Sequence, residues 1–237
     1  MKPRSPARLL FVFVAAAVAV FLLQARALEA GDLTVDASNG NSPYTVNSDA
    51  GYGNVTVGET GTGVLDQTSG TLLINNELDV ADQTTSNGIY NLSSGTVSPT
   101  AEIIGNYGTG TFTQTGGNND AGSSLSIGYN AGSSGTYNLN SFNGTATLGS
   151  LNSSGYANTE ETIGYCGNGT FNQSGGTNTA ADITIGYTAH STGTYNLSGG
   201  TISVGSTLNV GYNGTGAFVG SGTFNQTGGT ITHTPRT

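Results

Sequence analysis

The sequence predicts an all-β fold, a right-handed parallel β-helix of about seven to eight turns, with three short strands in each turn of roughly 22–25 residues. A nine-residue motif carries the prediction, because it returns as GTFNQSGGT at Gly169, GTYNLSGGT at Gly193 and GTFNQTGGT at Gly222. Glycine, a residue typical of turns, makes up 39 of the 237 residues, and short runs of alternating apolar and polar residues separate the glycines. Because this composition is periodic, it indicates a repeat fold and not a disordered chain.

Residues 1–27 have the layout of a secretory signal peptide. Three basic residues precede an apolar run over 9–23, and Ala25-Arg26-Ala27 follows as a small-x-small cleavage site. The apolar run is shorter than the ~20 residues of a typical membrane-spanning helix. We therefore expect cleavage after Ala27, a secreted or cell-surface protein, and no transmembrane segment in the mature chain.

The next segment, 28–54, is expected to form a degenerate first turn and an N-terminal cap. Its short strand-like runs are LTV at Leu33 and YTV at Tyr44, and VTV at Val55 resembles them. From there the repeat domain is predicted to extend over 55–237.

The glycine that opens the repeated motif marks each turn of the repeat domain. Successive copies are 25, 22, 25, 34, 24 and 29 residues apart. They lie at Gly63, Gly88, Gly110, Gly135, Gly169, Gly193 and Gly222. A second motif such as LSIGYN precedes the glycine, and a third such as TISV often follows it, so each unit holds three runs with strand periodicity. The two longest steps contain insertions at 150–160 and 214–221, which are loops where specific binding would lie.

Stacking of equivalent residues at ~4.8 Å in a parallel β-helix turns the repeats into columns. The aromatic position alternates between Tyr and Phe, and the position two residues later alternates between Leu and Gln, as in Tyr195 with Leu197 and Phe171 with Gln173. We expect both columns to point inward and each Gln amide to bond to the Tyr hydroxyl of an adjacent turn. A duplicated two-unit ancestor explains the same alternation without that bond. The neighbouring Asn column, for example Asn172, is expected on the opposite face.

The charge of the chain excludes one class of partner. The formal net charge is −9, and four of the five basic residues lie in the leader, so the mature chain carries 1 − 14 = −13. A chain whose only basic residue is Arg236 cannot neutralise phosphates, so we expect no nucleic acid partner. Anionic membrane surfaces are disfavoured for the same reason.

No catalytic residue is predicted, although two pairs of acids are near neighbours in the sequence. Asp79 and Asp82 flank the end of a strand, and Glu160 and Glu161 are adjacent and should diverge on a strand. An inverting glycoside hydrolase needs two carboxylates that face each other across a groove. We interpret all four residues as solvated surface acids.

No metal or cofactor site is predicted either. His190 and His233 have no ligand-like spacing to each other or to Cys166. The single cysteine excludes an intrachain disulfide and is interpreted as a small residue in a repeat slot, although a free thiol could pair between chains.

Units of the form LxIGYNGxGTFNQSGGT, from about Val55 to Thr232, resemble the glycine-rich β-strand repeats of bacterial cell-surface proteins. These include autotransporter passenger-type repeats and repeat proteins with a C-terminal sorting tail. The resemblance implies an extracellular solenoid that acts as an adhesin or surface-layer component. No Pro-Glu-Pro-type sorting tail follows the repeats, and the chain stops within its last turn, at TITHTPRT. We therefore expect a truncated repeat domain or a partner at that end.

These observations favour a non-enzymatic, adhesin-like surface or matrix protein that binds surface glycans or other surface proteins through its long face or its insertions. The alternative is a carbohydrate-active β-helix enzyme, a polysaccharide lyase or hydrolase. Because an open final turn exposes unpaired strand groups, end-to-end self-association is expected through the turn at 222–232.

Overall fold

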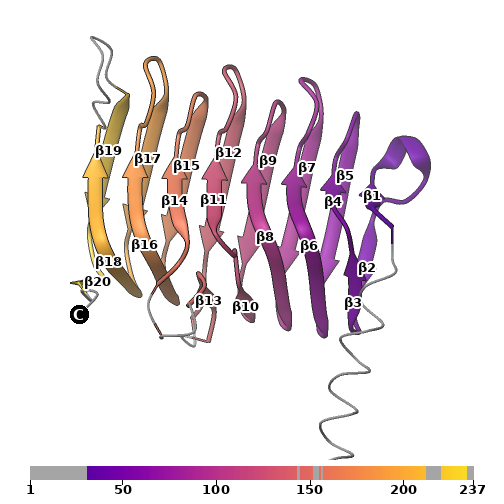
Figure 1. The fold of residues 1–237 in the computed structure, drawn as a ribbon, viewed down its shortest axis with the longest axis horizontal. Coiled ribbons are helices and arrows are strands. Elements are labelled where there is room, and N and C mark those ends of the chain that lie inside the picture. The colour runs from indigo at the N-terminus through magenta and orange to yellow at the C-terminus, as the bar shows by residue number, and fades with distance from the viewer. Residues whose placement is uncertain (1–30, 143–144, 152–154, 156, 212–219, 234–237) are drawn as a thin grey trace, which may run out of the picture.

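The computed structural model describes residues 31–142, 145–151, 155, 157–211 and 220–233. The chain winds into a parallel β-solenoid of about seven turns, which confirms the predicted fold class (Figure 1). Every pairing between its strands is parallel. Within these residues the only helix is a single 3-10 turn, η1 (Ala37–Asn39). The predicted leader and most of the insertion predicted at 214–221 lie outside the described residues.

One wall of the solenoid is an eight-stranded sheet that contains the repeated motif. Each strand carries the motif of one coil and pairs in register with the same motif one coil away, so that Gly169 lies opposite Gly135 and Gly193. Its members are β2 (Tyr44–Val46), β5 (Thr62–Gln67), β7 (Asn87–Leu92), β9 (Thr109–Gln114), β12 (Ser134–Leu139), β15 (Asn168–Gln173), β17 (Thr192–Leu197) and β19 (Ser221–Gln226).

The opposite wall is a twelve-stranded sheet that contains the other two predicted runs. Its members are β1 (Leu33–Val35), β3 (Ala50–Tyr52), β4 (Val55–Val57), β6 (Thr71–Val80), β8 (Thr96–Ile104), β10 (Asn118–Asn119), β11 (Ser124–Ile127), β13 (Thr147–Leu148), β14 (Glu160–Ile163), β16 (Thr177–Ile185), β18 (Thr201–Val210) and β20 (Thr230–His233). In β6, β8, β16 and β18 the two runs join into one long strand. The pairing of β6 with β8 changes register between Ile74 and Glu77, and the pairing of β16 with β18 changes register between Ala180 and Asp182. At each place one strand has one residue more than its partner.

The insertion at 150–160 interrupts this wall between β13 and β14. Its ends are held by an isolated antiparallel bridge between Leu151 and Ala157. The ladder resumes at Glu160, which pairs with Ser124 and Asp182 of the neighbouring coils. The loop therefore leaves the solenoid without disturbing its register.

The aromatic column points into the core, as predicted. Tyr90, Phe112, Tyr137, Phe171 and Tyr195 are fully buried. Their rings stack face to face with centroids 4.5–4.9 Å apart. Such contacts add about 0.5–1.5 kcal/mol per pair beyond burial.

The Asn column lies on the outer face of the eight-stranded sheet, also as predicted. Asn172 donates to Asn138 at 2.9 Å, Asn196 donates to Asn172 at 2.9 Å, and Asn225 donates to Asn196 at 2.9 Å. The column is thus a ladder of amide hydrogen bonds that links successive coils on the surface.

Glycine is required where the walls meet the turns. At Gly110, a Cβ would lie 2.3 Å from the Gly105 nitrogen and 2.4 Å from the Val80 oxygen, so a side chain would push the coils apart. Gly105 itself has a φ of 73°, the left-handed conformation that glycine adopts without strain.

The described residues contain no helix that is both long and apolar enough to cross a membrane.

Candidate functional site

The core contains a polar chain that follows the Tyr and Gln columns. Tyr90 donates to Oε1 of Gln67 at 2.5 Å, and Tyr137 donates to Oε1 of Gln114 at 2.6 Å. Tyr195 donates to Oε1 of Gln173 at 2.6 Å. The predicted bond between the Gln amide and an adjacent-turn Tyr is therefore confirmed, and the Tyr–Gln alternation satisfies buried polar groups.

Two of these pairs extend to a buried glutamate. The Asn119 amide donates to the Tyr137 hydroxyl at 3.1 Å and to Oε2 of Glu102 at 2.8 Å. Two coils later, the Asn178 amide donates to Tyr195 at 3.1 Å and to Oε2 of Glu161 at 2.9 Å.

In both networks one oxygen of the Glu and the oxygen of the Asn are buried without a hydrogen-bond partner. Burial raises the pKa of Glu102 to about 8, with the Asn119 hydrogen bond opposing the shift and the charge of Glu161 adding to it. Burial likewise raises the pKa of Glu161 to about 7, against the Asn178 hydrogen bond. Each network is therefore a closed structural unit of the core, with no access for a ligand.

The interpretation of Glu161 as a solvated surface acid was wrong. Glu161 pairs with Leu125 and Ile183 in an inward-facing column, and 2% of its surface is exposed. The adjacent Glu160 is exposed, as expected. Glu102, which the sequence reasoning missed, occupies the same column. The available signal was the alignment of EIIG and ETIG with LSIG, which puts both glutamates in the place of Leu125.

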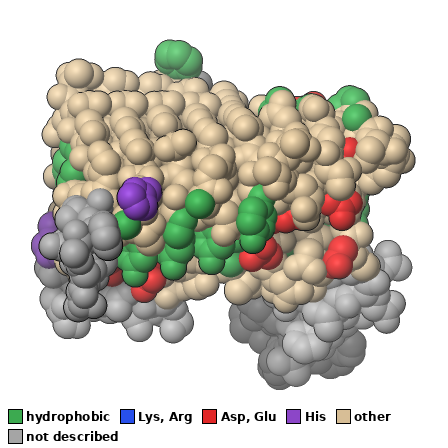
Figure 2. All heavy atoms as spheres, turned by 90° about the horizontal axis from the view of Figure 1, so that it is seen from above, with side chains coloured by type: hydrophobic (Ala, Val, Ile, Leu, Met, Phe, Trp, Pro, Cys, Tyr) green, Lys and Arg blue, Asp and Glu red, His purple; other side chains and the backbone are tan. Residues whose placement is uncertain are grey.

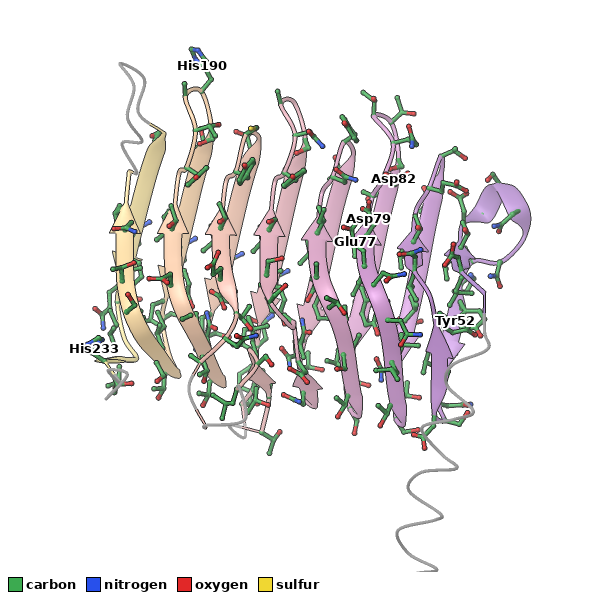
Figure 3. The ribbon with its side chains drawn as sticks, viewed as in Figure 1. Tyr52, Glu77, Asp79, Asp82, His190 and His233 are labelled. Carbon is green, nitrogen blue, oxygen red and sulfur yellow. The ribbon has the colours of Figure 1, made fainter. Side chains whose placement is uncertain are left out.

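A second group of acids lies on the outer face of the twelve-stranded sheet, along the last half of β6 and the turn after it (Figure 3). The Asn106 amide, one coil away, donates to Oδ2 of Asp79 at 2.6 Å and to Oδ1 of Asp82 at 3.1 Å. Asp79 is 7% exposed and its Oδ1 has no partner, while Asp82 and Glu77 are half-buried. The interpretation of Asp79 as a solvated acid was therefore wrong, because Asn106 and the neighbouring coil cover it.

The electrostatics of this acidic group favour a bound proton. Burial raises the pKa of Asp79 to about 8; the Asn106 hydrogen bond opposes the shift, and the charges of Asp82 and Glu77 add to it. The pKa of Glu77 is raised as well, by burial and by the charge of Asp82. A carboxyl of this kind can donate a proton at neutral pH, which is the chemistry of a general acid.

A row of aromatic side chains lies at the edge where the twelve-stranded sheet turns toward the other wall. Tyr129, Tyr165 and Tyr187, which we call the tyrosine row, are half-buried and occupy the same position in three successive coils. Their ring centroids are 4.9 and 5.0 Å apart, with interplanar angles of 22° and 18°. Figure 2, which looks onto these turns, shows hydrophobic side chains in a row along the molecule.

The alternation in LSIGY predicts that Tyr129 shares the buried face of Leu125 and Ile127, and this prediction was wrong, because Tyr129 is half-exposed. The signal that distinguishes the tyrosine row is the preceding glycine in the left-handed conformation, for example Gly164 with a φ of 76°. That conformation ends the inward-outward alternation of the strand, so the Tyr after it lies at the surface. Because each ring covers the face of the next, the exposed part of the row consists mainly of ring edges.

A cavity of about 340 Å³ lies beside the insertion between β13 and β14. It is lined by Asn118, Asp120, Thr147, Leu148, Gly149, Ser150, Leu151 and Thr179. Among the described residues that line it, Asp120 is the one carboxylate, so these residues do not supply the carboxylate pair that glycoside hydrolysis needs. Neither Asp79 nor Asp82 lines it.

The two histidines and the cysteine, for which the sequence predicts no site, lie in different parts of the solenoid. His190 lies in the turn before β17, and His233 ends β20, with its Nδ1 3.1 Å from the Val204 oxygen (Figure 3). Cys166 is a half-buried free thiol. In the part of the chain that the structure describes, no three His, Cys, Asp or Glu side chains form a group that could hold a metal ion.

Comparison with protein-family models, with curated protein sequences and with solved structures finds no match to this chain.

Proposed function

We propose that this protein is an exported, non-enzymatic repeat protein of the cell surface or extracellular matrix, and that it binds its partner through the tyrosine row. The observation that carries the proposal is the repetition of a half-exposed Tyr, stacked at about 5 Å, in three successive coils. A binding edge with one identical group per coil suits a ligand that repeats along its own length.

Surface glycans are the ligand class that this edge fits. Tyrosine offers an apolar ring edge and a hydroxyl together, and sugars present C–H and O–H groups side by side. All five basic residues of the chain lie outside the described residues, whereas thirteen of the fourteen acids lie within them. The described surface therefore favours neutral glycans over anionic ones.

Binding to a panel of neutral polysaccharides tests the proposal, with Tyr165→Ala as the diagnostic variant. We expect the unsubstituted protein to bind a member of the panel and the variant to lose at least tenfold in affinity. Thr170→Ala, on the outer face of the other sheet, is the matched control. A protein that binds no member, or binding that Tyr165→Ala leaves unchanged, would contradict this function.

The proposed export depends on the leader over residues 1–27. The basic start, the apolar run and the Ala25-Arg26-Ala27 site support it. N-terminal sequencing of protein from the medium or the cell surface should give Leu28 as the first residue. Protein that keeps its leader, or that stays inside the cell, would contradict the proposal.

A carbohydrate-active enzyme is the second candidate, and the acidic group supports it. Asp79 has the raised pKa of a general acid and shares the Asn106 amide with a second carboxylate, Asp82. Turnover of a polysaccharide that Asp79→Asn abolishes, with the fold intact, would favour this candidate over the first.

A further inference from the structure

We infer that the tyrosine row and the acidic group of Glu77, Asp79 and Asp82 form one continuous binding edge, and that the glycan bound there carries protonated amino groups, which the carboxyls recognise. The inference rests on the glycan binding proposed above. It adds the charge of the ligand and the residues that select it.

The column that holds the tyrosine row continues toward the N-terminal end as Asn106 and Asp82. The backbone bonds between coils show this register. Tyr129 donates to the oxygen of Gly105, the residue before Asn106, and Asn106 donates to the oxygen of Ala81, the residue before Asp82. With coils ~4.8 Å apart, Asp82 lies two steps, about 10 Å, from Tyr129. Figure 2 shows acidic side chains beyond the hydrophobic row on the same face, so a ligand that lies along the row would reach the carboxyls.

The acidic group contains a buried oxygen that has no donor. Asn106 gives its two amide protons to Oδ2 of Asp79 and to Oδ1 of Asp82, at 2.6 and 3.1 Å, so it has none left for Oδ1 of Asp79. That oxygen is buried without a hydrogen-bond partner, in a side chain that is 7% exposed. Unlike the unpartnered oxygens of Glu102 and Glu161, it belongs to an outer face. Because buried polar atoms normally have a partner, it indicates a place for a donor that the described chain does not supply.

The neighbours of Asp79 are acceptors as well. The carboxyls of Asp79 and Asp82 lie within hydrogen-bonding distance of each other, and that contact is a bond only while one of them keeps a proton. Glu77 is half-buried on the same strand, and Glu59 is exposed one coil before Asp82. The residues that the structure describes include no Lys or Arg, so a cationic ligand complements this group.

An amino sugar supplies both parts of the recognition. Its C–H and O–H groups fit the ring edges of the tyrosines, and its ammonium group can donate charge-assisted hydrogen bonds to carboxylates. Asp82 and Glu77 are half-buried and can contact the ammonium, whereas Asp79 is buried and acts through its charge. A metal ion fits less well, because no three His, Cys, Asp or Glu side chains of the described ranges form a group that could hold one.

Ligand binding should release a proton from Asp79. At neutral pH this carboxyl is protonated, because burial, with the charges of Asp82 and Glu77, raises its pKa to about 8 against the Asn106 hydrogen bond. An ammonium group nearby favours the ionised form, so we expect up to about one proton to leave for each ammonium bound. Calorimetry in two buffers of different ionisation enthalpy measures this release. Asp79→Asn should abolish it, and a release that Asp79→Asn leaves unchanged would contradict the role of Asp79.

Two glucosamine oligomers of equal length, one fully N-acetylated and one partly deacetylated, test the selection at a pH where the amines are protonated. We expect the unsubstituted protein to bind the deacetylated oligomer about tenfold more tightly, and Asp82→Asn to lose this preference but still bind the acetylated one. Asp66→Asn is the matched control, because Asp66 is also half-buried and accepts from an Asn of the next coil, on the opposite wall. Circular dichroism confirms that each variant keeps its strands.

The outcomes separate this inference from the proposed function. Equal affinity for the two oligomers, or a preference that Asp82→Asn leaves unchanged, would overturn the inference while glycan binding by the tyrosine row stands. Polylysine that binds through Asp82 and is unaffected by Tyr165→Ala would identify a cationic peptide as the ligand and overturn the amino-sugar assignment. Binding of neither oligomer would also overturn the inference, and the panel of neutral polysaccharides tests the proposed function independently.

Discussion

At the scale of single residues, the core of this solenoid is stabilised by polar contacts as well as by apolar packing. Tyr137 is the junction of one network, because its hydroxyl donates to Gln114 and accepts from Asn119. Tyr90 makes only the first of these bonds, to Gln67. The two tyrosines share one column and full burial, so they form a natural pair for comparison.

We expect Tyr137→Phe to destabilise the protein more than Tyr90→Phe does. Both changes keep the ring stack and remove one hydroxyl. A buried polar group without a partner costs about 1–3 kcal/mol, and Tyr137→Phe leaves two such groups where Tyr90→Phe leaves one. Unfolding by denaturant, followed by circular dichroism, measures both losses. Equal losses would mean that the bond from Asn119 contributes nothing.

The buried carboxyls make stability depend on pH. In the native state the pKa is about 8 for Glu102 and for Asp79, and about 7 for Glu161, against ordinary values of 4.5 for Glu and 3.8 for Asp. Between the unfolded and the native pKa values, the native state binds more protons than the unfolded state, so the free energy of unfolding falls as pH rises. We expect the full contribution below about pH 4 and its loss, on the order of several kcal/mol in total, as pH rises through about 7–8.

Thermal unfolding across this range measures the effect, with Glu102→Gln plus Glu161→Gln as the control. A Gln in either place can still accept from the Asn and cannot ionise. The double variant should therefore lose a large part of the pH dependence, and Asp79 accounts for what is left. A midpoint that rises from pH 5 to pH 8 in the unsubstituted protein would contradict the assignment.

At the scale of elements, the turn that leads from the twelve-stranded sheet to the eight-stranded sheet contains one left-handed residue in successive coils. Gly58 and Gly105 adopt φ values of 75° and 73° there. The coil between them has Ala81 instead, with a φ of 74° and no exposed surface. For a residue with a Cβ this conformation costs about 1–2 kcal/mol.

We expect Ala81→Gly to stabilise the protein by about 1 kcal/mol, after the greater flexibility of Gly in the unfolded chain offsets part of the gain. The reverse change in the next coil, Gly105→Ala, should destabilise it, because the new Cβ would lie 2.3 Å from the Ser134 oxygen. Denaturant midpoints of the two variants should move in opposite directions. A loss of stability in Ala81→Gly would show that the methyl group packs better than its backbone costs.

The strands and their register could be predicted from the sequence because stacking makes each position repeat. The Tyr and Gln alternation even revealed a hydrogen bond between coils, confirmed at Tyr137 and Gln114. The burial of Glu161 could not be predicted from residue type, because a carboxyl enters such a core only with a partner, and Asn178 comes from a different strand. The tyrosine row was missed because the alternation of a strand stops at its left-handed glycine.

At the scale of the whole molecule, the solenoid is a polar rod. Its acids gather toward the N-terminal end, and its tyrosine row lies along the following coils. The face seen in Figure 2 therefore changes from mainly acidic to mainly aromatic along the molecule. The coils themselves stay alike, because their register is set by the eight-stranded sheet.

The two-coil period of the core sets which lengths the chain can adopt. Glu102 and Glu161 occupy equivalent places two coils apart. Excision of residues 110–168 would join Thr109 to Gly169 and bring Glu102 to the Asn178 amide and Tyr195, which rebuilds the same network. Excision of residues 110–134 would remove one coil and leave the Tyr137 hydroxyl buried without its acceptor.

We therefore expect the longer deletion to fold and the shorter one to lose about 1–3 kcal/mol for each orphaned group, although it removes fewer residues. Denaturant unfolding of the two deletions compares them, and a more stable product from the shorter deletion would contradict the expectation. Recombination that adds or removes coils in pairs would therefore keep the Tyr–Gln bonds of this core, whereas the gain or loss of a single coil would break one of them.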